Sequence, residues 1–152
     1  MIDVADLQGG IVRGYGQRFG FARHLFARVR EPRAARAWLA ALADPVTTEE
    51  ERAQHPATTL NVALSFRALA ALELPGWILD GFPQEVREGM AARAKRLGDY
   101  PGTLEDELRD LEVLVVVHAQ SAPALRDERS PDCWGRGTPD PAQTGVSEVR
   151  VP

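Results

Sequence analysis

Three histidines and one cysteine are the side chains of this 152-residue sequence best suited to hold a metal ion. His24 and His118 each lie in an apolar, strand-like run, where a lone histidine is usually structural or partly exposed. His55 directly precedes Pro56 in a polar stretch, and Cys133 lies in a proline-rich stretch near the end. Because no two of these residues have the spacing of metal ligands, we predict no metal site.

The acidic residues, serines and glycines form no catalytic or phosphate-binding motif. Glu105, Asp106, Glu107 and Asp110 lie in a polar linker, where such charges are usually solvated. No serine lies in a G-x-S-x-G motif. The glycines between Asp6 and Gly16 lack the spacing of a nucleotide site, so we interpret that stretch as a shaped loop. We therefore predict no catalytic and no cofactor-binding residue.

Composition narrows the class of protein. A chain of 152 residues, 44% hydrophobic and 26% charged, is expected to form one globular domain with its own core. The net charge of -4 argues against a nucleic-acid or anionic-membrane partner, and no apolar run is long enough to span a bilayer. The start lacks a secretory signal, and a single cysteine suits a reducing compartment, so we expect a cytoplasmic protein.

The elements of the first half follow from apolar spacing. Residues 58–66 alternate apolar and polar side chains, and residues 21–29 carry apolar side chains on both faces, which predicts two strands. Residues 31–43 have helical spacing, with Trp38 on the apolar side as a core residue. Thr48 and Glu51 have the spacing of a capping box, which predicts one helical turn before Pro56.

The second half predicts two helices and a strong strand. Residues 67–74 form a short helix that ends at Pro75, and a second helix begins at Pro83 and ends before Gly98. Its buried stripe is predicted to be Val86, Met90, Ala94 and Leu97. The run 111–119 is nearly all apolar and β-branched, which favours an interior strand. Ser121-Ala122-Pro123 begins another helix that does not develop, and residues 130–152 lack periodicity.

This order of elements predicts an α+β fold, a ferredoxin-like sandwich with helices on one face of an antiparallel sheet. A complete fold of this type needs a further helix and a fourth strand after Gln120, and we expect the chain to lose both. We therefore divide it into a domain at residues 1–129, truncated after the strand 111–119, and a disordered or irregular tail at 130–152.

Several spaced motifs carry a resemblance to a known family. LQGGIVRGYG (7–16), TTLNVAL (58–64), LAALELP (69–75) and FPQEVREGMAARAKRLGD (82–99) resemble the amino-terminal half of dye-decolourising (DyP-type) haem peroxidases. The resemblance covers about Asp6 to Gln120. It implies two ferredoxin-like halves in the whole family protein, and the oxidation of dyes, phenols and similar substrates by hydrogen peroxide at haem b.

The residues that the resemblance implies for catalysis have no counterpart here. The family's proximal histidine and distal arginine lie in its carboxy-terminal half, and its distal aspartate lies in a G-x-x-D-G motif. The segment from Gly76 to Gly81 reads G-x-x-x-D-G, one residue too long, so Asp80 is rejected as that aspartate. His118 could ligate haem iron by its chemistry, but it does not lie at the family's ligand position. We expect no haem on this chain alone.

The leading hypothesis is therefore the amino-terminal portion of a DyP-type peroxidase, inactive as this chain alone. Its expected partners are a carboxy-terminal peroxidase half or a second copy. Two alternatives remain: a non-catalytic ferredoxin-like assembly or regulatory module whose sheet edge recruits a partner strand, and the remnant of a frameshifted peroxidase gene.

Overall fold

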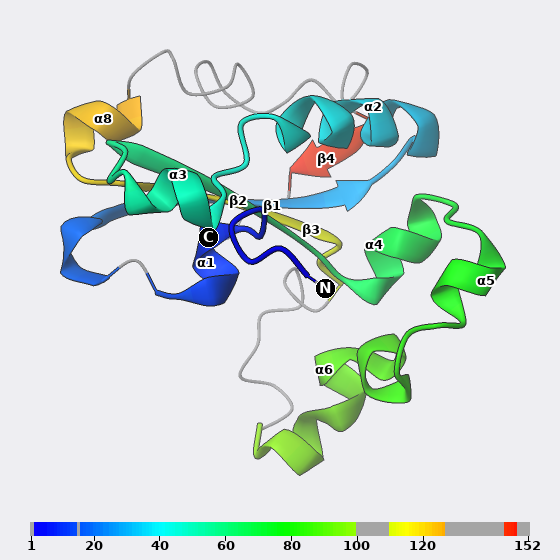
Figure 1. Cartoon of the computed structure of the whole chain (residues 1–152). Coiled ribbons are helices and arrows are strands. Elements are labelled where there is room, and N and C mark those ends of the chain that lie inside the picture. Colours follow the sequence, from blue (N-terminus) through cyan, green and yellow to red (C-terminus); the bar gives the residue numbers. More distant parts are fainter. Residues whose placement is uncertain (1, 15, 100–109, 127–144, 149–152) are drawn as a thin grey trace.

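The computed structural model describes residues 2–14, 16–99, 110–126 and 145–148, and Figure 1 shows how their helices and strands are arranged. The strands are β1 (Phe21–Val29), β2 (Thr58–Leu64), β3 (Val113–Ala119) and β4 (Val146–Glu148). The helices are α1 (Gly9–Val12), α2 (Pro32–Ala43), α3 (Glu49–Ala53), α4 (Phe66–Ala71), α5 (Gly76–Leu79), α6 (Gln84–Leu97) and α8 (Ala122–Arg126), with a 3-10 turn at Gly16–Arg18. No helix in these ranges is long and apolar enough to cross a membrane.

The described strands form one sheet in the order β2-β3-β1-β4, with every neighbouring pair antiparallel. Val115 at the middle of β3 pairs with Leu25 of β1 on one side and with Val62 of β2 on the other. This order and direction confirm the predicted α+β, ferredoxin-like fold, and they confirm that the run 111–119 contains an interior strand. Strand β2 ends two residues earlier than predicted, because the Ser65 side chain accepts a hydrogen bond from the Ala68 N–H and caps α4.

Alternation along β3 divides the sheet into two unequal faces. Val113, Val115, Val117 and Ala119 are at most 3% exposed, whereas the residues between them are half-buried. Helices α2 and α4 supply the side chains that cover the buried face, as Figure 1 shows for α2 above the sheet. The core consists of Leu25, Ala27, Ala35, Trp38, Leu42, Leu60, Ala68, Leu72, Val113, Val115, Val117 and Val146. The prediction of Trp38 as a core residue is thus confirmed.

Strand β4 corrects the expected loss of the fourth strand. Residues 146–148 pair antiparallel with Ala27–Val29 at the end of β1, and Val146 is fully buried in the core. The carbonyl of Gly145 accepts hydrogen bonds from the N–H groups of Arg30 (2.7 Å) and Glu31 (2.9 Å). The sheet therefore includes residues from the segment that was expected to be an irregular tail. The rest of that segment lies outside the described residues. The expected Ser121 cap is present, since its Oγ accepts from the Ala124 N–H.

The outer edge of β2 is occupied by polar groups from the amino-terminal half. The Gln8 side chain donates to the Val62 carbonyl and accepts from the Val62 N–H, both at 2.9 Å. Thr47 pairs with Leu60 in a similar way: its N–H donates to the Leu60 carbonyl, and its hydroxyl oxygen accepts from the Leu60 N–H, both at 2.9 Å. Because these side chains and the Thr47 N–H already pair with the backbone of β2 at Leu60 and Val62, few backbone groups on this edge remain to pair with an added strand.

Helix α6 differs from the prediction in its shape and burial. Its limits agree with the prediction, since Pro83 precedes it and Gly98 ends it in the left-handed conformation. Gly89, however, has φ 72° and ψ 174°, which breaks the helix into two parts. The predicted buried stripe is wrong, because Val86, Met90 and Leu97 are 44%, 71% and 49% exposed. Figure 1 shows α6 set apart from the sheet, and none of its residues belongs to the described core.

Local caps position the remaining helices. The predicted capping box is confirmed: Thr48 Oγ1 accepts from the Glu51 N–H, and the Glu51 carboxylate accepts from the Thr48 N–H. The Glu31 carboxylate accepts from the backbone N–H groups of Ala34 and Arg33 at the start of α2. These backbone hydrogen bonds, that of Ala34 first, lower the pKa of Glu31, because they stabilise its charged form.

Candidate functional site

The side chains best placed for chemistry lie on the sheet face opposite the core, which we call the open face. It comprises the alternate residues of the three longer strands, namely Ala22, His24 and Phe26 of β1, Leu114, Val116 and His118 of β3, and Thr59, Asn61 and Ala63 of β2. Ala22, His24 and Ala63 are exposed, and most of the others are half-buried.

The register places the two strand histidines close together. His118 lies directly opposite Ala22 on β1, and His24 lies directly opposite Val116. The two histidines are therefore diagonal neighbours on adjacent strands, a position about 7–8 Å apart between Cα atoms and within reach of long side chains. On its other side, His118 lies directly opposite Thr59. His118 is thus the centre of a small polar cluster on the open face.

Thr59 is the unusual member of this cluster. It is 1% exposed, and its hydroxyl oxygen has no hydrogen-bond partner among the described residues. Leaving a buried hydroxyl unpaired costs about 1–3 kcal/mol, so such a group normally finds a partner. The cluster therefore holds one polar atom that a ligand or a bound water would satisfy.

Electrostatics favour the neutral form of His118. Burial lowers the pKa of His118 from its ordinary value of 6.5, and the nearby charge of His24 lowers it further. The His24 ring stacks on Phe26, with 6.2 Å between ring centroids and 12° between planes. The His118 imidazole is therefore mainly neutral at neutral pH.

Acidification is expected to weaken the fold through His118. Because its pKa is lower in the folded chain, the unfolded chain binds more protons as the pH falls from about 7.5 through 6.5 and below. The free energy of unfolding should therefore decrease over this window and stop changing, for this group, below the folded pKa. Urea denaturation at several pH values measures this loss.

A His118→Gln variant, which cannot titrate, should lose this part of the pH dependence. A His55→Gln variant serves as the matched control and should keep it. An equal pH dependence in wild type and His118→Gln would contradict the assignment.

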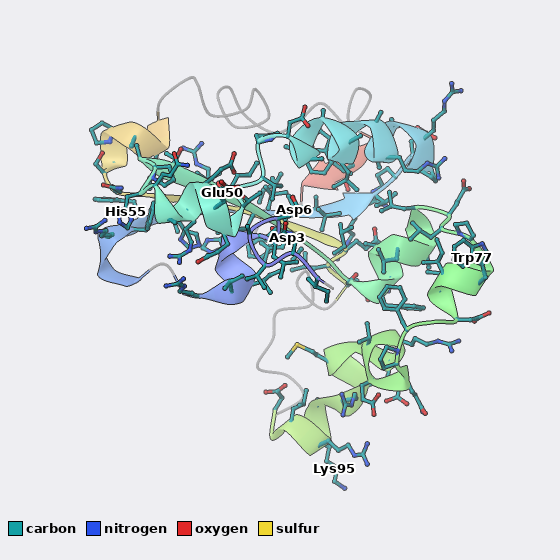
Figure 2. The ribbon with its side chains drawn as sticks, viewed as in Figure 1. Asp3, Asp6, Glu50, His55, Trp77 and Lys95 are labelled. Carbon is teal, nitrogen blue, oxygen red and sulfur yellow. The ribbon has the colours of Figure 1, made fainter. Side chains whose placement is uncertain are left out.

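The other residues considered for chemistry lie apart from this cluster. Figure 2 shows His55 beside α3, where its side chain is exposed. Asp80 lies at the end of α5, and its only ion-pair contact among the described residues is with Arg87 at 3.6 Å. Asp110 pairs with Arg67 at 2.6 Å, and the other members of its acidic run lie outside the described residues. Over the described ranges, no three His, Cys, Asp or Glu side chains converge as a metal site would require.

A buried carboxylate near α1 also has a structural explanation. Glu49 of α3 is buried, and both of its oxygens bond Arg52, at 2.6 and 2.8 Å. Arg13 adds a third contact at 3.0 Å. The hydrogen bond from Arg52, and then the charges of Arg52 and Arg13, lower the pKa of Glu49. These partners hold α3 to the amino-terminal segment and leave the carboxylate no role as a base.

The hollow that the described residues form offers no ligand for a haem. An open hollow of about 540 Å³ is lined by Phe66, Gln84, Arg87 and Glu88, none of which is a type of side chain that ligates haem iron. The histidines of the open face project from a sheet, with His24 exposed to solvent. A haem site needs an axial ligand inside an apolar slot, so we derive no catalytic step through that group here.

Sequence reasoning treated His24 and His118 as isolated residues and missed their proximity. Each is flanked by apolar residues, and the residues around either histidine do not indicate that the other lies nearby. Their alternation within the two strands predicts that each faces one side of the sheet. The register that brings them together depends on long-range strand pairing.

Comparison with solved structures connects this fold to known proteins. The chain superposes on a DyP-type peroxidase of Anabaena sp. with TM-score 0.66 and 22% identity over 78% of this chain. It superposes on an ancestral D-type dye-decolorizing peroxidase (TM-score 0.74, 22% identity) and on a decolorizing peroxidase of Auricularia auricula-judae (0.74, 16%), each over 98% of this chain. At such identities the likeness establishes a shared fold.

The chain spans only 29–34% of the length of these three peroxidases. No protein-family model matches the sequence, and no curated protein matches it.

Proposed function

We propose that this chain is the amino-terminal portion of a DyP-type haem peroxidase and supplies its first ferredoxin-like unit. The observation that carries the proposal is the agreement of two comparisons: motifs between Leu7 and Asp99 resemble the family, and the fold matches three of its solved members. The sheet order β2-β3-β1-β4 and the coverage of nearly the whole chain support a common architecture rather than a local match.

In this proposal the remainder of the peroxidase supplies haem and catalysis. The supporting observations are that the described hollow offers no haem ligand and that the matched chains are about three times as long. Hydrogen peroxide and small aromatic reductants are then substrates of the assembled protein in the cytoplasm, with haem b held by the remainder. This chain contributes a stable sheet.

Hemin titration of the purified chain tests the proposal. We expect no histidine-type Soret band and no peroxide-dependent dye oxidation above that of free hemin, because no described histidine lies in an apolar slot. A strong Soret band that disappears in His118→Ala would show that the chain holds haem by itself, and would contradict the proposal. His55→Ala is the matched control for nonspecific imidazole binding.

The downstream DNA, translated in all three frames, provides a second test. A histidine-bearing carboxy-terminal half with a G-x-x-D-G motif in the same frame or a neighbouring gene supports the proposed division of labour. Its presence only in a shifted frame favours the gene remnant, and its complete absence favours the non-catalytic module. That module would need an edge other than β2, whose backbone groups at Leu60 and Val62 are already paired.

A further inference from the structure

We propose that copies of this chain associate with one another through the second part of α6, which contacts the amino-terminal segment of the next copy. The contact joins a basic surface to an acidic one, and each surface also carries exposed apolar side chains. The proposal goes beyond the peroxidase assignment and holds whether or not that assignment is right.

The second part of α6 carries the basic surface. Gly89 breaks the helix, so residues 90–97 form a separate helical segment with three positive charges and no acidic residue. Helical spacing places Met90, Arg93 and Leu97 on one side of this segment, with Arg96 beside them. Met90 and Leu97 are 71% and 49% exposed. The basic surface is therefore an apolar strip with arginines along it, and no described core residue belongs to it.

The helix dipole explains only part of this arrangement. Basic residues in the last turn stabilise a helix end, which accounts for the position of Arg96. The dipole does not account for the apolar side chains that stay exposed beside it. Neither Arg93 nor Arg96 forms an ion pair with another described residue. Their charges are thus available to a partner.

The acidic surface lies on the amino-terminal segment and the start of α3. The carbonyl of Ala5 accepts a hydrogen bond from the Glu50 N–H at 3.2 Å, which holds this segment beside α3. Two apolar residues of the surface are 75% and 52% exposed, and its acidic residues are exposed and form no ion pair with another described residue. The acidic surface consists of Ile2, Asp3, Val4, Asp6 and Glu50.

Charge complementarity identifies a second copy as the partner. Removing the three positive charges of residues 90–97 from the net charge of -4 leaves -7 on the rest of the chain. Opposite charges steer two surfaces together and fix their orientation, and apolar side chains at the centre exclude water from the ion pairs. Both surfaces of this chain supply both kinds of group.

The two surfaces cannot satisfy each other within one chain. Figure 2 shows Lys95 at the tip of α6, pointing away from the sheet and well apart from Asp3 and Asp6. The contact therefore forms between copies, with unlike surfaces facing each other. A contact of this kind leaves one surface of each type free in a pair, so association continues into a ring or an open chain.

Sedimentation velocity of the purified chain at rising concentration tests the proposal. A reducing agent prevents disulfides through Cys133, the only cysteine. We expect association that weakens about tenfold or more when salt rises from about 0.1 M to about 1 M, because the screening length falls from about 10 Å to about 3 Å. Met90→Ser should weaken association about fivefold at every salt concentration, since apolar burial is not screened.

Arg96→Glu and Lys95→Glu form a matched pair of variants. Both change the net charge equally, but helical spacing places Lys95 on the side of α6 away from the apolar strip. We expect Arg96→Glu to weaken association about tenfold or more and Lys95→Glu to leave it nearly unchanged at about 0.1 M salt. Both side chains are exposed, so both variants should fold, which circular dichroism verifies.

A charge exchange identifies the two surfaces as partners. Arg93→Glu/Arg96→Glu makes the basic surface acidic, and Asp6→Lys/Glu50→Lys makes the acidic surface basic. Each double variant alone should be monomeric, because its two surfaces then carry charges of the same sign. An equal mixture of the two should associate again, since each variant now complements the other.

Four results would overturn the proposal. A parent that stays monomeric at low salt is the first, and equal effects of Arg96→Glu and Lys95→Glu are the second. The third is a mixture of the charge-reversed variants that stays monomeric. The fourth is a monomeric parent that binds vesicles of anionic lipid, or a separate carboxy-terminal peroxidase half, through Arg93 and Arg96, which would assign the basic surface to that partner.

Discussion

Replacing Val115 with asparagine is expected to destabilise the fold by about 4 kcal/mol or more, which is a large part of the roughly 5–15 kcal/mol that stabilises an ordinary domain. Val115 is fully buried at the centre of β3, between Leu25 and Val62. Asparagine removes an apolar side chain from the core and places an amide where the described neighbours offer only apolar groups. Urea denaturation followed by circular dichroism measures the loss.

Val116→Asn is the matched control, one residue along the same strand. Val116 lies on the open face between His24 and Asn61, where it is only half-buried. Its amide can reach water, so we expect a loss of about 1 kcal/mol. Equal losses in the two variants would contradict the division of the sheet into a covered and an open face.

Gly145→Ala is expected to cost about 3 kcal/mol or more and to release β4 from the sheet. Gly145 has φ +65°, a conformation that strains any residue with a Cβ atom. A methyl group there would lie 2.6 Å from the backbone nitrogen of Ala35 and even closer to the Glu31 carbonyl oxygen. Backbone atoms cannot yield as a flexible side chain would, so β4 or the start of α2 must move.

Gly16→Ala separates the two contributions to this cost. Gly16 has a similar φ of +63°, but an added Cβ would meet nothing within 4 Å. We therefore expect Gly16→Ala to show the conformational penalty alone, about 1 kcal/mol. Hydrogen exchange of the Val146 amide in Gly145→Ala then reports whether β4 has detached. Similar losses in both variants would show that the contact with α2 does not matter.

The peroxidase proposal rests on the whole sheet as a scaffold, so it is tested by hemin and by the neighbouring DNA.

Local signals in the sequence were sufficient for most of the secondary structure. Residues 21–29 form the predicted strand, because its apolar residues lie on both faces of a short segment and such a pattern is local. The Thr48–Glu51 capping box and the stop at Gly98 were also predicted, since each depends on groups a few residues apart. The ferredoxin-like fold followed from the order of these elements.

Tertiary structure decided the features that depend on distant residues. Strand β4 has three residues, too few for a periodic signal, and it exists because Gly145 bonds the start of α2 and Val146 fills the core. The apolar stripe of α6 predicted burial, yet a pattern states only that one side of a helix is apolar. Whether another element covers that side is decided by packing.

His24 and His118 show the same division. Their types and their places in two strands were evident from the sequence, and so was the absence of ligand spacing. Their proximity, the unpartnered hydroxyl of Thr59 and the solvent access of His24 arise from the pairing of β1, β2 and β3. Strand register is set by contacts far apart in the chain, so only the folded sheet brings these groups together.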